Sequence, residues 1–157
     1  MILLTDTREQ APLDFKVGGA VSSIRVEGLP FGDYWAETEW GECMKVCFER
    51  KSLADLWGTL TNADNHARFK REIERAKAED FSFLLVIEGT FTGVLEGFGR
   101  SEFKGESMAK MLFTMWVRYN VYPVFCQSRK EMAKFIVETF EAYGRENCKR
   151  TAKRIKS

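Results

Sequence analysis

The chain has few of the residues that build zinc sites or disulfide frameworks. It contains four cysteines, none of them in a Cys-x-x-Cys pair, and His66 is its only histidine. A structural zinc site needs four such ligands, usually in closely spaced pairs, so the composition argues against one. Unpaired thiols are typical of a reducing compartment, and we expect a cytoplasmic or nucleoid-associated protein that is not secreted.

The sequence also lacks a long apolar run and an excess of one charge. No apolar stretch approaches the length of a membrane span, and residues 1–6 are too short and too quickly acidic for a signal peptide. The 24 lysines and arginines nearly balance the 23 aspartates and glutamates, which gives a net charge of +1. The chain as a whole is therefore no polycation, although a nucleic-acid partner needs only a local basic surface.

The sequence does contain a succession of strands and helices typical of one domain, and 157 residues are enough to bury a single core. Apolar runs predict strands over 2–5, 22–27, 81–88 and 121–126, and a hairpin around Trp40 that joins 33–37 to 43–49. Helical spacing predicts helices over 52–60, 66–79, 106–120 and 128–143, the last one ended by Gly144, with a glycine-rich loop over 90–105. This order predicts an α/β fold with a mixed central sheet flanked by helices, as one domain over 1–146 followed by a basic tail over 147–157.

Three polar residues, Asp33, Glu49 and Lys51, are expected at one end of the predicted hairpin. Glu49 and Lys51 are two apart on one strand, so their side chains point to the same side of the sheet. Two carboxylates form an oxygen-rich site suited to Mg²⁺, and a neighbouring lysine can stabilise phosphate charge or orient a water. A solvated strand face can carry the same residues, but here the strand leads directly into a helix N-terminus, where α/β sheets place ligand sites. The pattern therefore favours phosphodiester hydrolysis.

Several motifs in this region resemble those of one known family. Gly32-Asp33-Tyr34 followed by Glu49-Arg50-Lys51-Ser52-Leu53-Ala54-Asp55 resembles the GDY…ERKxxxD signature of the XPF family of structure-specific endonucleases. Asp6-Thr7-Arg8-Glu9 is similar to the opening strand of that family, Leu60-Thr61-Asn62 with Arg68 to the segment after its first helix, and Leu84-Leu85-Val86-Ile87-Glu88 to a later strand. The motifs occur in the order of the family, between Leu3 and Glu88.

The resemblance implies a restriction-endonuclease-like fold, dependence on Mg²⁺ with Mn²⁺ as a substitute, and cleavage of branched, flapped or junction DNA in repair or recombination. It also implies that Asp33 and Glu49 bind the metal, that Lys51 is the catalytic lysine, and that a charged rim is completed by Asp6, Arg8, Glu9, Arg50 and Asp55. From the residues alone, Arg8 or Arg50 would clamp a phosphate and Asp55 would support its neighbours or only cap a helix. Asp6 or Glu9 could hold a second ion, and the number of metals stays open.

The sequence departs from the family pattern in two respects. Ala67 and Glu72 stand where the family usually has Gly and Gln, which affects DNA contacts expected from that helix. Family members usually carry a tandem helix-hairpin-helix domain after the nuclease domain, and this sequence has none. Its substrate preference is therefore not inherited directly, and a compact form as encoded by phages or mobile elements is expected.

Further contacts with DNA and with a second subunit are predicted from basic and apolar residues. Arg68 and the tail residues Lys149, Arg150, Lys153 and Arg154 are candidates for binding the DNA backbone. Apolar residues on the last two helices exceed what one sheet face requires, which predicts a homodimer: Met111, Met115, Trp116, Phe135, Ile136, Phe140 and Tyr143. Two alternatives to an active nuclease stay open: a catalytically silent DNA-binding subunit that pairs with an active nuclease, and a scaffold that binds other proteins.

Overall fold

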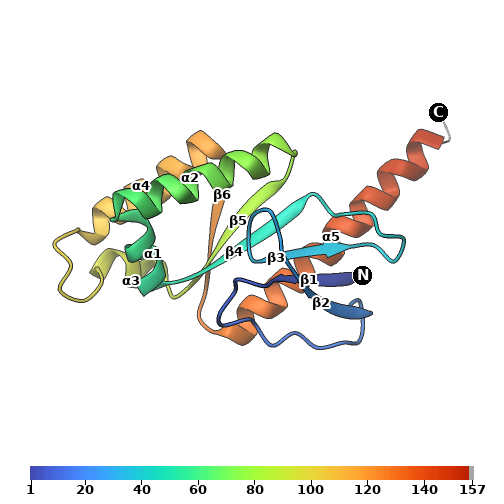
Figure 1. Cartoon of the computed structure of the whole chain (residues 1–157), viewed down its shortest axis with the longest axis horizontal. Helices are drawn as coiled ribbons and strands as arrows, with labels where there is room; N and C mark the ends of the chain where they lie inside the picture. Colours follow the sequence, from blue (N-terminus) through green and yellow to red (C-terminus); the bar gives the residue numbers. More distant parts are fainter. Residues whose placement is uncertain (156–157) are drawn as a thin grey trace.

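The protein is built on one mixed β-sheet of six strands, and a computed structural model describes the backbone of residues 1–155 and the side chains of residues 1–147 (Figure 1). The strands follow the order β2-β1-β3-β4-β5-β6 across the sheet. Their bounds are β1 Ile2–Asp6, β2 Ser23–Glu27, β3 Tyr34–Glu37, β4 Val46–Ser52, β5 Ser82–Glu88 and β6 Val121–Cys126. β3 pairs antiparallel with β1 and β4, and the remaining neighbours are parallel. The predicted mixed sheet and the predicted hairpin are confirmed.

Helices cover both faces of this sheet, as predicted for an α/β fold. Their bounds are α1 Leu53–Leu60, α2 Ala63–Ala78, α3 Phe91–Glu96, α4 Gly105–Tyr119 and α5 Arg129–Ile155. Leu56 of α1, Ile73 of α2 and Met108 of α4 share one apolar core with the sheet. Met132, Ile136 and Phe140 of α5 belong to a second core on the other face. In the part of the chain that the structure describes, none of these helices is long and apolar enough to cross a bilayer.

Strand β4 contributes alternate residues to the two cores. Cys47 lies in the core under α1, α2 and α4, whereas Phe48 lies in the core under α5. Because side chains alternate along a strand, Glu49 and Lys51 continue the side of Cys47 and Arg50 continues the side of Phe48. The three consecutive residues are therefore divided between the two faces of the sheet.

Helix ends follow local capping, and here the structure refines the predictions. Ser52 caps α1 through a complete capping box with Asp55. Asn62 caps α2 by accepting a hydrogen bond from the backbone N–H of Asn65, so the helix begins at Ala63 rather than at His66. The loop predicted over 90–105 contains the short helix α3, which Thr90 caps.

The predicted end of the last helix at Gly144 is wrong, because α5 continues to Ile155. A glycine ends a helix by adopting positive φ, and Gly144 is not among the glycines that do. A Cβ at Gly144 would lie 3.4 Å from the end of the Met44 side chain, so the helix passes beside the β3–β4 connection at this point. Basic residues from 149 onwards thus follow a helical backbone, and their side chains lie outside the described residues.

The connection between β1 and β2 is unusual for a parallel pair. Parallel neighbours are commonly joined through a crossover helix, but residues 7–22 contain none. Leu13, Phe15 and Val21 of this connection pack into the same core as α5. The face of the sheet opposite α1, α2 and α4 is therefore covered by α5 together with an irregular segment.

Candidate active site

The turn before β3 fixes Asp33 beside the end of β4. The backbone N–H of Asp33 donates to the Phe48 carbonyl at 2.7 Å, and its carbonyl accepts from the backbone N–H of Asp6 at 2.8 Å. Gly32 has a φ of +67°, and a Cβ there would lie 3.1 Å from the Phe48 carbonyl oxygen. A side chain at this position would be strained and crowded. The glycine is thus needed for the turn that brings Asp33 next to Glu49.

Asp33 and Glu49 form a pair of carboxylates that disfavour one another's charge. Burial, followed by the proximity of Glu49, raises the pKa of Asp33 to about 8. Burial also raises the pKa of Glu49, although the neighbouring Lys51 opposes the shift. Two such groups are stabilised by a proton or by a cation between them. The site therefore favours a positive ligand.

Lys51 lies on the same side of β4 as Glu49 and contacts it directly. Its Nζ donates to Oε1 of Glu49 and lies 5.4 Å from the centre of the Phe69 ring of α2. Burial alone would lower the pKa of Lys51, but the charge and hydrogen bond of Glu49, together with the charges of Asp33 and Glu72, outweigh that effect and the pKa is raised. The ammonium group is therefore charged and held within the site.

The donors around this pair fit a divalent cation. Asp33 and Glu49 line a cavity of about 650 Å³ that reaches α2, and both also line an adjoining cavity of about 450 Å³ beside α1. Within residues 1–147, no cluster of three His, Cys, Asp or Glu residues forms a ready ligand set. Mg²⁺ is commonly held by one or two carboxylates, with water and substrate phosphate completing its shell. Asp33 and Glu49 are the two residues that would hold it.

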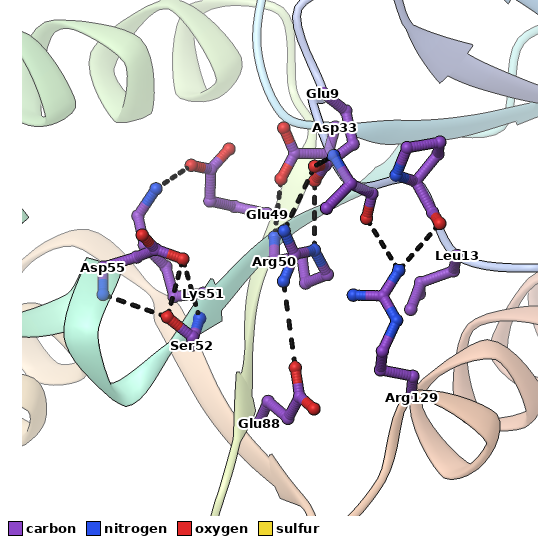
Figure 2. Close-up of polar contacts among 12 residues, drawn as sticks. Glu9, Leu13, Asp33, Glu49, Arg50, Lys51, Ser52, Asp55, Glu88 and Arg129 are labelled. Carbon is purple, nitrogen blue, oxygen red and sulfur yellow. Dashed lines mark hydrogen bonds and ion pairs between the residues drawn. The ribbon is translucent and has the colours of Figure 1, made fainter.

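Arg50 points to the opposite side of the sheet from Glu49 and Lys51 (Figure 2). Its Nε and Nη2 each donate to the Glu9 carboxylate at 3.1 Å, and its Nη1 lies 3.9 Å from Glu88. The side chains of Arg50 and Glu9 are only 9% and 6% exposed. The backbone N–H of Arg50 donates to Oδ2 of Asp33 at 2.7 Å. Arg50 thus holds Asp33 in place, and its role in phosphate binding stays a prediction.

Asp6 and Arg8 form a second ion pair at the edge of the cavity. The Asp6 carboxylate accepts from the backbone and side chain of Arg8 and from the backbone N–H of Leu29, all at 2.6–2.8 Å. Burial opposes the charge of Asp6, but these hydrogen bonds outweigh it and lower its pKa. Both Asp6 oxygens are therefore engaged within the protein. The Arg8 side chain is 62% exposed and lines both cavities, where a phosphate can reach it.

The other predicted residues have more peripheral positions. The Asp55 carboxylate accepts from Ser52 Oγ at 2.7 Å and from the Ser52 backbone N–H at 3.2 Å, so it caps α1 while lining the cavity. Arg68 is exposed and lines both cavities. The predicted DNA contacts of Lys149, Arg150, Lys153 and Arg154 lie outside the described side chains.

Glu72 is a site residue whose contact was not predicted. Its Oε1 accepts from the backbone N–H of Gly32 at 3.0 Å, and it lines the same cavity as Asp33 and Glu49. Helix α2 also holds this turn through Arg75, which donates to the Pro30 carbonyl at 3.1 Å. The available signal was helical spacing, because residues three and four apart place Glu72 on the same face as Phe69 and Arg68.

The residues of this site lie within a segment that matches a known protein family. The family model of the ERCC4 domain matches residues 5–139. The chain belongs to the ERCC4 domain family. That match includes Asp33, Glu49 and Lys51, and it confirms the resemblance seen in the sequence motifs. For this ERCC4 domain, comparison with the curated proteins gives no match.

The fold of this ERCC4 domain is similar to two solved structures of XPF. XPF from Aeropyrum pernix has a TM-score of 0.62 and 18% identity, and the match covers 88% of this chain and 59% of that one. XPF from the same organism in complex with DNA has a TM-score of 0.61 and 19% identity, with 94% and 65% covered. The chain thus spans less than two thirds of either structure. The likeness confirms the predicted fold.

Proposed function

We propose that this ERCC4 domain is a metal-dependent endonuclease that hydrolyses phosphodiester bonds in DNA, with Mg²⁺ as its ion and Mn²⁺ as a substitute. The observation that carries the proposal is the placement of Asp33, Glu49 and the charged Lys51 around one open cavity. Family membership supports a DNA endonuclease of the XPF kind, and one similar structure is XPF bound to DNA. We further propose branched, flapped or junction DNA as the substrate, in repair or recombination.

Each residue of the site has a chemical role in this proposal. Asp33 and Glu49 would hold the cation, which would supply positive charge near the phosphate and the attacking water. The Lys51 ammonium faces the same cavity and stabilises negative charge that develops on the phosphate. The exposed Arg8 guanidinium binds an adjacent phosphate, for which its planar fork is well suited. Arg50 and Glu72 keep the Asp33 turn in position.

The proposal is tested with labelled single-strand, duplex, flap, fork and four-way junction DNAs in Mg²⁺, Mn²⁺ or EDTA. We expect cleavage that needs a divalent ion and is lost in Asp33→Ala and in Lys51→Ala, while the matched carboxylate control Asp80→Asn cleaves as wild type. Binding of Mn²⁺, measured by electron paramagnetic resonance, is expected to be lost in Asp33→Ala. A folded wild-type protein that neither cleaves any substrate nor binds Mn²⁺ would instead be a silent subunit or a scaffold.

The structure changes the basis for the proposed homodimer. Ile136, Phe140 and Met115 are buried within the single chain, so they do not call for a partner. Trp116, in contrast, belongs to an exposed apolar patch formed by α3, α4 and β6. The patch residues are Phe91, Phe113, Trp116, Val117 and Tyr122. We propose that two copies pair through this patch, because exposed apolar residues gathered on one surface mark interaction sites.

Analytical ultracentrifugation tests the pairing. Val117 is 80% exposed near the C-terminal end of α4, and Val117→Asp is expected to convert a dimer into a monomer. Val26, which is 68% exposed on β2, provides the control Val26→Asp, which should remain dimeric. A wild-type mass of one chain at all concentrations would contradict the homodimer.

A further inference from the structure

A groove of about 690 Å³ lies on the face of the sheet covered by α5, outside the candidate active site. Residues of the β1–β2 connection form one wall and the first turns of α5 form the other. Arg129 joins the two walls, because its Nη2 donates to the Ala11 and Pro12 carbonyls at 2.7 Å each (Figure 2). The apolar lining consists of Pro12, Phe15, Val21, Ala133 and Val137.

The groove exists because the β1–β2 connection contains no helix. A crossover helix would cover the sheet beside α5, as in most parallel units. Here Gly18 and Gly19, with φ values of +138° and +59°, turn the chain back before a helix can form. Phe15 and Val21 cover part of the sheet but leave the space next to α5 open.

The α5 wall of the groove is basic. Lys130 and Lys134 are four residues apart, so they lie on the same face of the helix, and both are exposed. Among the described side chains, neither forms an ion pair, whereas Lys16 on the facing wall is paired with Asp14 at 2.7 Å. The groove therefore offers an apolar floor with unpaired positive charge along one side.

We propose that this groove binds an amphipathic helix with acidic flanks, supplied by a partner protein. The apolar side of such a helix packs on Phe15, Val21 and Val137, and its carboxylates approach Lys130 and Lys134. Helices commonly dock in grooves of this kind through apolar residues at i, i+3, i+4 and i+7. A DNA strand fits less well, because the floor of the groove is apolar. The proposal makes no use of the Asp33 site.

Selection from a displayed library of helical peptides tests the proposal on the full chain. We expect enrichment of peptides with an apolar stripe flanked by Asp or Glu, and then measure binding of the enriched peptide by fluorescence anisotropy. Lys130→Glu/Lys134→Glu should weaken it about tenfold or more, because two attractions become repulsions. The matched reversal Lys77→Glu/Lys110→Glu, at exposed lysines of α2 and α4, should bind as wild type. A peptide with Lys in place of its acids should bind the first variant.

Peptide binding in the groove is expected to be independent of DNA cleavage at the Asp33 site. Lys130→Glu/Lys134→Glu should unfold and cleave DNA as wild type does, and Asp33→Ala should bind the peptide normally. Enrichment without an acidic amphipathic pattern, or peptide binding that both double variants leave unchanged, would overturn the proposal. It would equally be overturned if a single-stranded oligonucleotide, and no peptide, lost binding in Lys130→Glu/Lys134→Glu.

Discussion

The two sides of β4 carry neighbouring residues with opposite environments. On one side, Glu49 and Lys51 border an open cavity, where their charges are available to a ligand. On the other side, Arg50 forms ion pairs with Glu9 and Glu88, although Arg50 and Glu9 also line the smaller of the two cavities. Of the three consecutive residues Glu49, Arg50 and Lys51, the first and third thus point to one side of the sheet and the second to the other. The strand separates them because successive side chains point to opposite faces of the sheet.

The largest contrast is expected between variants of Lys51 and Arg50. Lys51→Ala should lower the cleavage rate about 10²–10³-fold, the cost of losing one positioned charge at a reacting phosphate, and it also leaves the buried Glu49 without its ion-pair partner. Arg50→Ala should lower the free energy of unfolding by about 3–5 kcal/mol, because it leaves Glu9 buried without its partner. Urea unfolding and single-turnover cleavage separate the two effects.

The double variant Arg50→Ala/Glu9→Ala serves as the control for this contrast. It removes the unpaired carboxylate, so it should regain part of the stability that Arg50→Ala loses. Equal stability of Arg50→Ala and wild type would show that the two sides of β4 are not divided in this way.

A smaller effect is expected at Glu72, which acts on the cavity side through the Gly32–Asp33 turn. Glu72→Ala removes the acceptor for the Gly32 N–H and should lower the cleavage rate roughly tenfold, as the loss of one hydrogen bond of about 1.4 kcal/mol would. Glu72→Gln keeps an acceptor oxygen and should restore the rate. If the Gln and Ala variants were equally slow, the charge of Glu72 rather than its hydrogen bond would matter.

The smallest expected effect is on the thermal stability of the protein when no metal ion is bound. The pKa of Asp33 is raised from 3.8 to about 8, so between these values the native state holds a proton that the unfolded chain has lost. The free energy of unfolding therefore falls as pH rises through this window. In EDTA near the upper end of the window, Asp33→Asn should raise Tm by roughly 2–4 °C for each kcal/mol of repulsion removed, while Asp80→Asn should not. A Tm of Asp33→Asn that follows wild type at every pH would contradict this.

Much of the site could be predicted from the sequence because it depends on local rules. The spacing of Glu49 and Lys51 gave their common side, and Ser52 marked the start of α1 through its cap. The same alternation turns the Arg50 side chain away from those of Glu49 and Lys51, while Arg50 still lines the smaller cavity with them, and its role in the site stays a prediction. Glu72 contacts Gly32 across 40 positions of sequence, a contact that no local pattern contains.

The fold, like the site, could be predicted from the sequence only where local patterns determine it. The positions of the strands and helices along the chain follow from apolar periodicity, but Gly144 was wrongly expected to end α5. Whether a glycine ends a helix depends on its φ, and Gly144 is not among the glycines with positive φ, so the helix continues through it. The groove beside α5 was not predicted either. It arises from the absence of an element, and periodicity detects only elements that are present.

The β3–β4 turn provides a place for attaching probes. It joins the hairpin at the end remote from Asp33, which precedes β3. Trp40 at its tip is 91% exposed, and Gly41 adopts a φ of +78°. Exposed turn tips of this kind accept insertions and labels. A fluorophore at position 40 would therefore report tumbling and assembly of the protein without touching the carboxylates, the apolar patch or the groove.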